Sequence, residues 1–349
     1  TWGTNAITID SNGLNFQGEP DTYIVDYDTA GQALNLVYSG ATVGWTPSSD
    51  IVNAFDHTAP PTQRGMFAYG DTGSQSSLKN LVTSSGVIGS DVTGVGSARS
   101  ALAAAGYGGD KAIFAYGTTG TYVSTSNLAN SEGVIAADVT GVGTARVQIT
   151  ASSFGGDKAI FAYGYDGSNT VGMTNLVNSS GVVASDISVV GSARRDFGGA
   201  SYGLDKGIFY GGTNAAGTRV NISSLVSNIG VMSADVSGVG TARTCYGVSY
   251  GGDKAVFAFG YAAIGYSNLS NKVSNTGVVA ADTSGVGTAR GTNPGSTYGA
   301  DKAIFAYGNS GSNVSMSNLV SNSGVVATDV TGVGTARNSL AAAGYSSTA

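Results

Sequence analysis

The feature that most constrains the fold of this chain is an internal repeat of about 48 residues. The clearest copy runs from Asp110 to Phe154, and its pattern recurs until the chain ends. An Arg that closes a GTAR-like tetrapeptide marks each copy, and an Asp about eight residues earlier keeps the same register. Six copies of each landmark predict six structural units, with the Arg landmarks at Arg99, Arg146, Arg194, Arg243, Arg290 and Arg337.

Each copy is typical of four short strands. One is the small-residue segment after the Arg, the next is an apolar segment such as KAIFAYG, and SNLV-like and GVVA-like segments follow. The 55 glycines among 349 residues argue against long helices. A repeat of this length with four strands per unit is the signature of a β-propeller. We therefore predict an all-β chain in which residues 64–349 form a six-bladed β-propeller with four-stranded blades.

The two ends of the repeat predict how the ring of blades closes. The first copy begins at Arg64 with what reads as a second strand, whereas the last copy ends with a first strand at Leu340 to Tyr345. We expect this C-terminal strand to complete the first blade. Such a closure leaves no open sheet edge at the seam, where other chains could pair.

The order of these segments resembles the kelch repeat over residues 64–349, which implies that the strand after each Arg is innermost in its blade. Two features depart from the kelch pattern: its Gly doublet occurs only at Gly211-Gly212, and Val134 and Val182 stand where a kelch blade has Trp. The sequence motifs of the copies also resemble repeats of phage virion proteins such as tail or capsid fibres; examples are DKAIFAYG, MTNLV and GVGTAR.

Residues 1–63 lie outside the repeat and predict a small β module with a linker. Residues 6–10, 22–27 and 33–38 are typical of strands, Asp56 to Pro61 is typical of a stiff linker, and both tryptophans, Trp2 and Trp45, lie here. A module this small buries little apolar surface alone. We expect it to pack against the predicted propeller, against a second copy in a homo-oligomer or against a larger assembly, and to attach the protein to other virion or surface proteins.

Composition excludes several classes of function. The net charge is −6 and no Lys/Arg cluster occurs, which argues against nucleic-acid binding. No apolar run approaches the roughly 18 residues of a membrane helix, so no membrane span is expected. The single cysteine, Cys245, excludes a disulfide framework and a multi-cysteine metal site.

Catalytic chemistry is also disfavoured. The only histidine, His57, lies in the predicted linker, so the repeat has no histidine for a Ser/His/Asp catalytic relay. For the same reason it lacks the two histidine ligands of a copper site like that of galactose oxidase, a kelch-like enzyme. Galactose oxidase also has a Tyr cross-linked to a Cys. Cys245 precedes Tyr246 in this chain, but without a nearby histidine it is expected to be a small buried thiol. We predict no catalytic residue, metal or cofactor. A carbohydrate-active or oxidative enzyme and a kelch-like protein-interaction adaptor are the alternatives.

The six landmark arginines allow two interpretations. In the first, each guanidinium group bonds a carboxylate or backbone carbonyl where two blades meet, and the role is structural. In the second, the six groups form a ring near the channel that binds an anionic sugar or phosphate. We expect the structural role, because a six-fold recurrence is typical of a scaffold, whereas a functional site breaks the symmetry.

The loops between second and third strands are the variable part of the repeat. Because antiparallel strands alternate in direction, these six loops share one face of the predicted propeller. Tyr122, Tyr165, Tyr261 and Tyr266 lie in them and offer flat surfaces for a sugar ring or a protein partner. The sequence thus predicts a non-enzymatic structural protein of a virion surface or the extracellular space, whose loop face binds a receptor or glycan.

Overall fold

The computed structural model describes residues 7–19, 25–27, 35–48, 63–188 and 190–346. The chain divides into two compact units, Thr1–Pro60 and Pro61–Ala349. All regular structure in the described residues is β, in small antiparallel sheets without a helix, so the all-β prediction is confirmed. Consequently no helix there could cross a membrane. The predicted linker from Asp56 to Pro61, with His57, lies outside the described residues.

The first unit contains two short antiparallel hairpins. Strand β1 (Ile7–Ile9) pairs with β2 (Val25–Tyr27), and β3 (Leu36–Tyr38) pairs with β4 (Trp45–Pro47). The rings of Tyr38 and Trp45 face each other across the second hairpin, 5.4 Å apart. The sequence did not predict β4, because three residues that end in a proline show no strand alternation.

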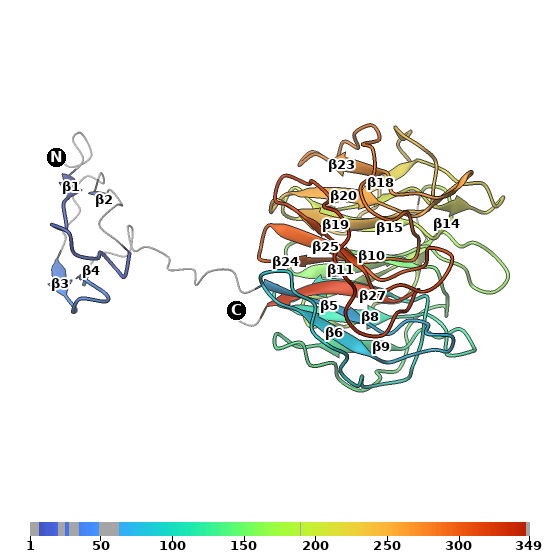
Figure 1. The fold of residues 1–349 in the computed structure, drawn as a ribbon, viewed down its shortest axis with the longest axis horizontal. Helices are drawn as coiled ribbons and strands as arrows, with labels where there is room; N and C mark the ends of the chain where they lie inside the picture. Colours follow the sequence, from blue (N-terminus) through green and yellow to red (C-terminus); the bar gives the residue numbers. More distant parts are fainter. Residues whose placement is uncertain (1–6, 20–24, 28–34, 49–62, 189, 347–349) are drawn as a thin grey trace. The chain divides into compact units, whose positions relative to one another are not determined.

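The second unit contains six sheets that follow the six copies of the repeat (Figure 1). Sheets 1 to 6 have the strand orders β27-β5-β6, β7-β8-β9, β10-β11-β12-β13, β15-β16-β18, β19-β20-β23 and β24-β25-β26. The first strands are β27 (Ala341–Ser346), β7 (Ala103–Tyr107), β10 (Thr150–Phe154), β15 (Gly198–Tyr202), β19 (Tyr246–Tyr250) and β24 (Gly295–Tyr298). The second strands are β5 (Gln63–Ala68), β8 (Lys111–Ala115), β11 (Lys158–Ala162), β16 (Lys206–Tyr210), β20 (Lys254–Ala258) and β25 (Lys302–Ala306). The third strands are β6 (Lys79–Val82), β9 (Ser126–Ala129), β12 (Met173–Val177), β18 (Ser223–Val226), β23 (Ser270–Val273) and β26 (Ser317–Val320).

A regular fourth strand, β13 (Ile187–Ser188), occurs only in sheet 3, so the prediction of four-stranded units is wrong for the other five sheets as the structure describes them. In sheet 1 the fourth segment touches the third strand only at two bridges, Val82 with Ile88 and Lys79 with Val92. The third strand advances three residues between these bridges and the fourth segment advances four. The extra residue makes a bulge that interrupts the ladder and turns Asp91 back toward the third strand.

Alternate side chains of each second strand enter two different cores. In β8, Phe114 packs between sheets 1 and 2, while Ile113 and Ala115 pack between sheets 2 and 3. Both faces of this strand are therefore buried, which explains why KAIFA is an unbroken apolar run rather than an alternating one. Six such core clusters each join two successive sheets, and one of them joins sheet 6 to sheet 1 through Phe67, Ile304 and Leu340.

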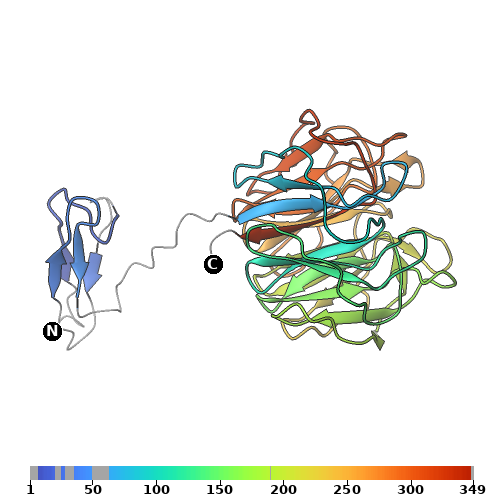
Figure 2. The ribbon, with the colours of Figure 1, turned by 90° about the horizontal axis from the view of Figure 1, so that it is seen from below.

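The C-terminal strand lies where the sequence predicts. Strand β27 pairs antiparallel with β5, with Ala341 opposite Ala68 and Tyr345 opposite Arg64 (Figure 2). The first strands also contact one another from sheet to sheet, in the order β27, β7, β10, β15, β19 and β24, and β24 contacts β27 again. The contacts between successive sheets thus run from sheet 1 to sheet 6, and sheet 6 in turn contacts sheet 1.

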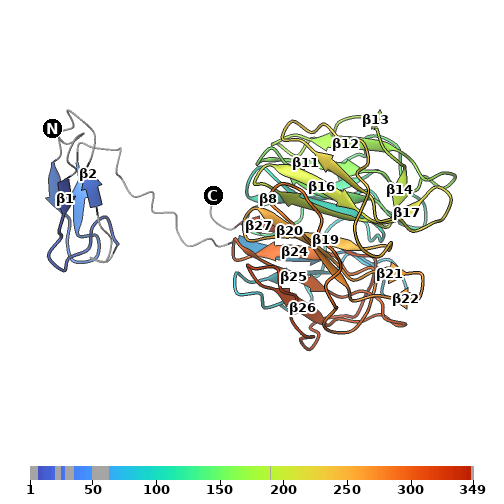
Figure 3. The ribbon, with the colours of Figure 1, turned by 90° about the horizontal axis from the view of Figure 1, so that it is seen from above.

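Four short strands occur where the connections and the second-to-third loops meet. Strand β14 (Arg194–Arg195) pairs with β17 (Thr213–Asn214), and β21 (Tyr261–Ala262) pairs with β22 (Gly265–Tyr266). Figure 3 shows both strand pairs on the same side of the unit. This agrees with the expectation that these loops share a face.

We expect removal of residues 339–349 to destabilise the second unit severely, because it deletes β27 and exposes the edge of β5 and the cores on both sides. The thermal unfolding midpoint, followed by circular dichroism, should fall by more than about 10 °C. Removal of residues 1–60 is the control and should leave that midpoint unchanged. An unchanged midpoint in the C-terminally shortened chain would contradict the role given to β27.

Candidate functional site

The landmark arginines lie between sheets, as Arg146 illustrates. Its guanidinium group is fully buried and donates from Nε to the carbonyl of Tyr163 (2.8 Å) and from Nη2 to Oδ1 of Asn175 (2.6 Å), both in sheet 3. The same group lies 3.7 Å from Asp186 Oδ1. On its other side it stacks on the Tyr116 ring of sheet 2, at 4.3 Å. One side chain therefore joins two sheets through charge, hydrogen bonds and ring contact.

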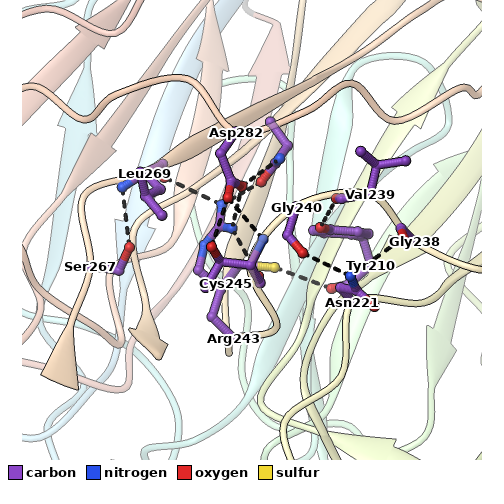
Figure 4. Close-up of polar contacts among 12 residues, drawn as sticks. Tyr210, Asn221, Gly238, Val239, Gly240, Arg243, Cys245, Ser267, Leu269 and Asp282 are labelled. Carbon is purple, nitrogen blue, oxygen red and sulfur yellow. Dashed lines mark hydrogen bonds and ion pairs between the residues drawn. The ribbon is translucent and has the colours of Figure 1, made fainter. Parts of the chain in front are cut away.

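This arrangement, which we call the arginine clamp, recurs at every junction between sheets. The landmark arginines are all fully buried, and the other five pairs are Arg99 with Asp138, Arg194 with Asp235, Arg243 with Asp282, Arg290 with Asp329 and Arg337 with Asp91. Figure 4 shows Arg243 directed at Asp282 and at the carbonyl of Leu269. Groups held in this way are closed to a dissolved anion, which supports the structural interpretation over the anion-binding ring.

The aspartates of the clamps remain charged despite their partial burial. Burial alone would raise the pKa of Asp186, but hydrogen bonds from Thr144 and Asn175, together with the charge of Arg146, outweigh it and lower the pKa. The other five clamp aspartates have lowered pKa values by the same balance. The clamps therefore contribute stability above about pH 4 that is lost as these carboxylates are protonated at lower pH.

The aromatic residue under the guanidinium group adopts a strained backbone conformation. Tyr116 has a φ of 65°, in the left-handed region that favours glycine, and it ends the strand. Its ring stacks on Arg146, and its hydroxyl donates to the carbonyl of Val142. Sheet 4 satisfies the same constraint with the doublet Gly211-Gly212, where Gly211 has a φ of 73°. The Gly doublet thus occurs in the sheet where no aromatic residue fills the left-handed position.

We expect Arg146→Ala to lower the free energy of unfolding by about 1 to 3 kcal/mol, because Asn175 and Asp186 lose a buried partner. Urea denaturation measures the difference. Lys158→Ala is the matched control: Lys158 pairs with Asp157 on the surface, and its loss should change stability by less than about 0.5 kcal/mol. If Arg146→Ala were as stable as the parent but had lost binding of an anion, the anion-ring interpretation would replace the clamp.

The variable loops form rows of side chains on one face, which we call the loop face. A complete row contains three residues that lie opposite one another in a small ladder. The middle residue begins the variable loop; on one side it pairs with a residue just after the landmark Arg, and on the other with a later residue of the same loop. Ser100, Thr118 and Tyr122 form such a row, with Thr118 in the middle. Directly opposite residues in a ladder direct their side chains to the same side. The further rows are Val147, Tyr165 and Thr170; Arg195, Thr213 and Arg219; Tyr261 and Tyr266; Gly291, Asn309 and Asn313; and Asn338, Asp71 and Gln75.

The four predicted tyrosines fall into two pairs on this face. The rings of Tyr122 and Tyr165 are 6.3 Å apart and come from neighbouring rows, whereas Tyr261 and Tyr266 share a row, 5.2 Å apart. Tyr122, Tyr261 and Tyr266 are 38 to 39% exposed, and Tyr165 is half-buried. The structure therefore brings these residues together within pairs and leaves each pair a surface open to solvent.

Two arginines lie between the tyrosine pairs, and the sequence analysis missed them. The Arg195 guanidinium group lies 5.1 Å from the Tyr165 ring centre, and that of Arg219 lies 4.6 Å from Tyr261. Arg195 also donates to the Thr170 hydroxyl at 3.1 Å. The available signal was their position: Arg195 directly follows the landmark Arg194, and Arg219 is the only basic residue in the six variable loops.

A cavity of about 420 Å³ lies along the first strands of all six sheets. Its walls are mostly Ala, Gly and Ser, with larger side chains at both ends, and at the end where the first strands begin these include Gln148, Asp196 and Tyr246. Gln148 donates to Asp196 at 2.9 Å. Burial raises the pKa of Asp196 to about 6, against the opposing charges of Arg195 and Arg219. This end of the cavity is thus polar in sheets 3 to 5 and breaks the symmetry of the repeat.

We expect Asp196→Asn to stabilise the protein at pH 8 by about 1 to 2 kcal/mol. The raised pKa means that folding favours the protonated acid, so this stability is present below about pH 4 and lost as the pH rises through 6. Urea denaturation of both proteins at pH 4 and pH 8 measures the effect, and the difference should close at pH 4. A difference that is the same at both values would contradict the raised pKa.

The described residues hold no group of three or more His, Cys, Asp or Glu side chains that could bind a metal. Cys245 is buried, and its thiol donates to the carbonyl of Tyr210 at 3.2 Å (Figure 4). Burial raises the pKa of this thiol, which makes it a poor nucleophile. No protein-family model matches the chain, and no curated protein is similar to it at a significant level.

Proposed function

We propose that the second unit is a six-bladed, kelch-like β-propeller, and that the protein is a non-enzymatic structural protein of a virion surface or the extracellular space. The propeller is supported by the six sheets, by the contacts that return from β24 to β27 and by the pairing of β27 with β5. The resemblance of the repeat's sequence motifs to those of phage virion proteins supports the virion assignment. The first unit is proposed as the part that attaches to other surface proteins or to further copies.

The loop face is proposed to bind a glycan receptor. The observation that carries this proposal is the clustering of two tyrosine pairs on one face of an otherwise repetitive scaffold. Partly exposed tyrosine rings stack on the apolar faces of sugars, while their hydroxyl groups bond to sugar hydroxyls. A protein receptor is the second candidate, because half-exposed tyrosines also anchor protein interfaces.

We expect two double variants, Tyr122→Ala with Tyr165→Ala and Tyr261→Ala with Tyr266→Ala, each to weaken glycan binding at least ten-fold, because each removes one stacking surface. A glycan array identifies ligands of the parent protein, and titration calorimetry measures each affinity. Lys158→Ala, in the first-to-second-strand turn, is the control and should bind like the parent. Equal binding by the parent and both double variants would contradict a tyrosine-lined glycan site.

A further inference from the structure

The two unpredicted arginines of the loop face lie in one row. Arg195 in β14 is opposite Thr213 in β17, and Thr213 is opposite Arg219. Adjacent strands are about 5 Å apart, so the two arginine backbones are separated by roughly 10 Å, with both side chains on the same side of the ladder. Side chains of this length can reach one ligand group between them.

The guanidinium groups are held in place but are not neutralised by an ion pair. Tyr165 and Tyr261 support them from the two neighbouring rows. The landmark arginines and the lysines of the five Asp-Lys turns all have an aspartate within 4 Å, whereas no such pair involves Arg195 or Arg219 among the described residues. Donor groups in this row are therefore left for a ligand.

One negative charge lies near this row without cancelling it. Asp196 interacts electrostatically with both arginines, but its carboxylate accepts its hydrogen bond from Gln148 and lines the cavity. Two guanidinium charges near this one carboxylate leave the row with a local excess of positive charge, on a protein whose net charge is −6. Such a local site suits a ligand with a single acidic group better than a polyanion, which the overall charge repels.

We propose that Arg195 and Arg219 form an acid-binding subsite that takes the carboxylate or sulfate of an acidic sugar. Planar guanidinium groups bond the two oxygens of such an acid side by side. Tyr165 and Tyr261 flank the subsite and support its two guanidinium groups, so a sugar whose acidic group lies between the arginines lies between the two tyrosine pairs. This inference rests on the proposed glycan-binding function and specifies the class of sugar.

Titration calorimetry with three trisaccharides tests the subsite: a galactotriose in which one residue is galacturonate, a monosulfated galactotriose and neutral galactotriose. The parent should bind at least one acidic probe ten-fold or more tightly than the neutral one, and the preferred probe shows whether the acid is a carboxylate or a sulfate. Arg195→Gln and Arg219→Gln should each weaken that probe about ten-fold and leave neutral binding unchanged. Lys158→Gln is the charge-matched control, and thermal unfolding verifies that each variant is folded.

The outcomes separate this inference from the function on which it rests. If the tyrosine double variants lose binding of all three probes while the arginine variants bind like the parent, the glycan site stands and the acid subsite is wrong. If binding is indifferent to tyrosine and arginine variants alike, or if neither the three probes nor the glycan array shows a ligand of the parent, both proposals are overturned. Retention of acid preference in Arg195→Lys but not in Arg195→Gln would confirm that the charge is the determinant.

Discussion

A buried guanidinium group between every two successive sheets is the interaction on which the rest of this structure depends. A buried charge is costly unless it is paired and its donors are satisfied. The clamp supplies one Asp, a backbone carbonyl and, at most junctions, an Asn or Ser and a stacked aromatic ring, all at fixed positions in the repeat. In the described structure it leaves Nε and Nη1 of Arg99 and Nε of Arg194 without a hydrogen-bond partner. The need for these partners explains why the GTAR and Asp landmarks change so little from copy to copy, while the loops outside the clamp vary freely.

Much of the architecture could be predicted because it follows from local patterns. Unbroken apolar runs such as KAIFA marked strands buried on both faces, and the incomplete first and last copies predicted the pairing of β27 with β5. The reduced fourth strand could not be predicted, since the fourth segment has one extra residue relative to the third strand, and sheet 3 keeps the short β13 despite the same extra residue. Asn293 was equally hidden: it is fully buried where Leu102 and Leu340 stand in other copies, and its amide has no hydrogen-bond partner in the described structure.

Only part of the candidate site could be predicted from the sequence: the four tyrosines, but not the two arginines between them. Composition drew attention to exposed tyrosines in variable loops, and these do lie on one face. Arg195 and Arg219 are 24 positions apart in the chain, and only the ladder through Thr213 places them in one row. The interior of the second unit is thus nearly symmetric, because the repeat encodes it. The loop face is asymmetric, and its chemistry depends on which rows of loop residues lie next to each other. Cavity residues Asp196 and Tyr246 add to the asymmetry on the same side of the ring.

If the six sheets, joined by their clamps and sealed by β27, form the proposed closed ring, they unfold as one cooperative unit. Native-state hydrogen exchange of the full chain tests this cooperativity most directly, because the exchange free energy of each amide reports how the segment around it opens. A closed ring predicts that core amides of β5 and β27, at the seam, exchange with the same free energy as those of β11 and β16. Exchange at the seam several kcal/mol easier than in β11 and β16 would contradict the account.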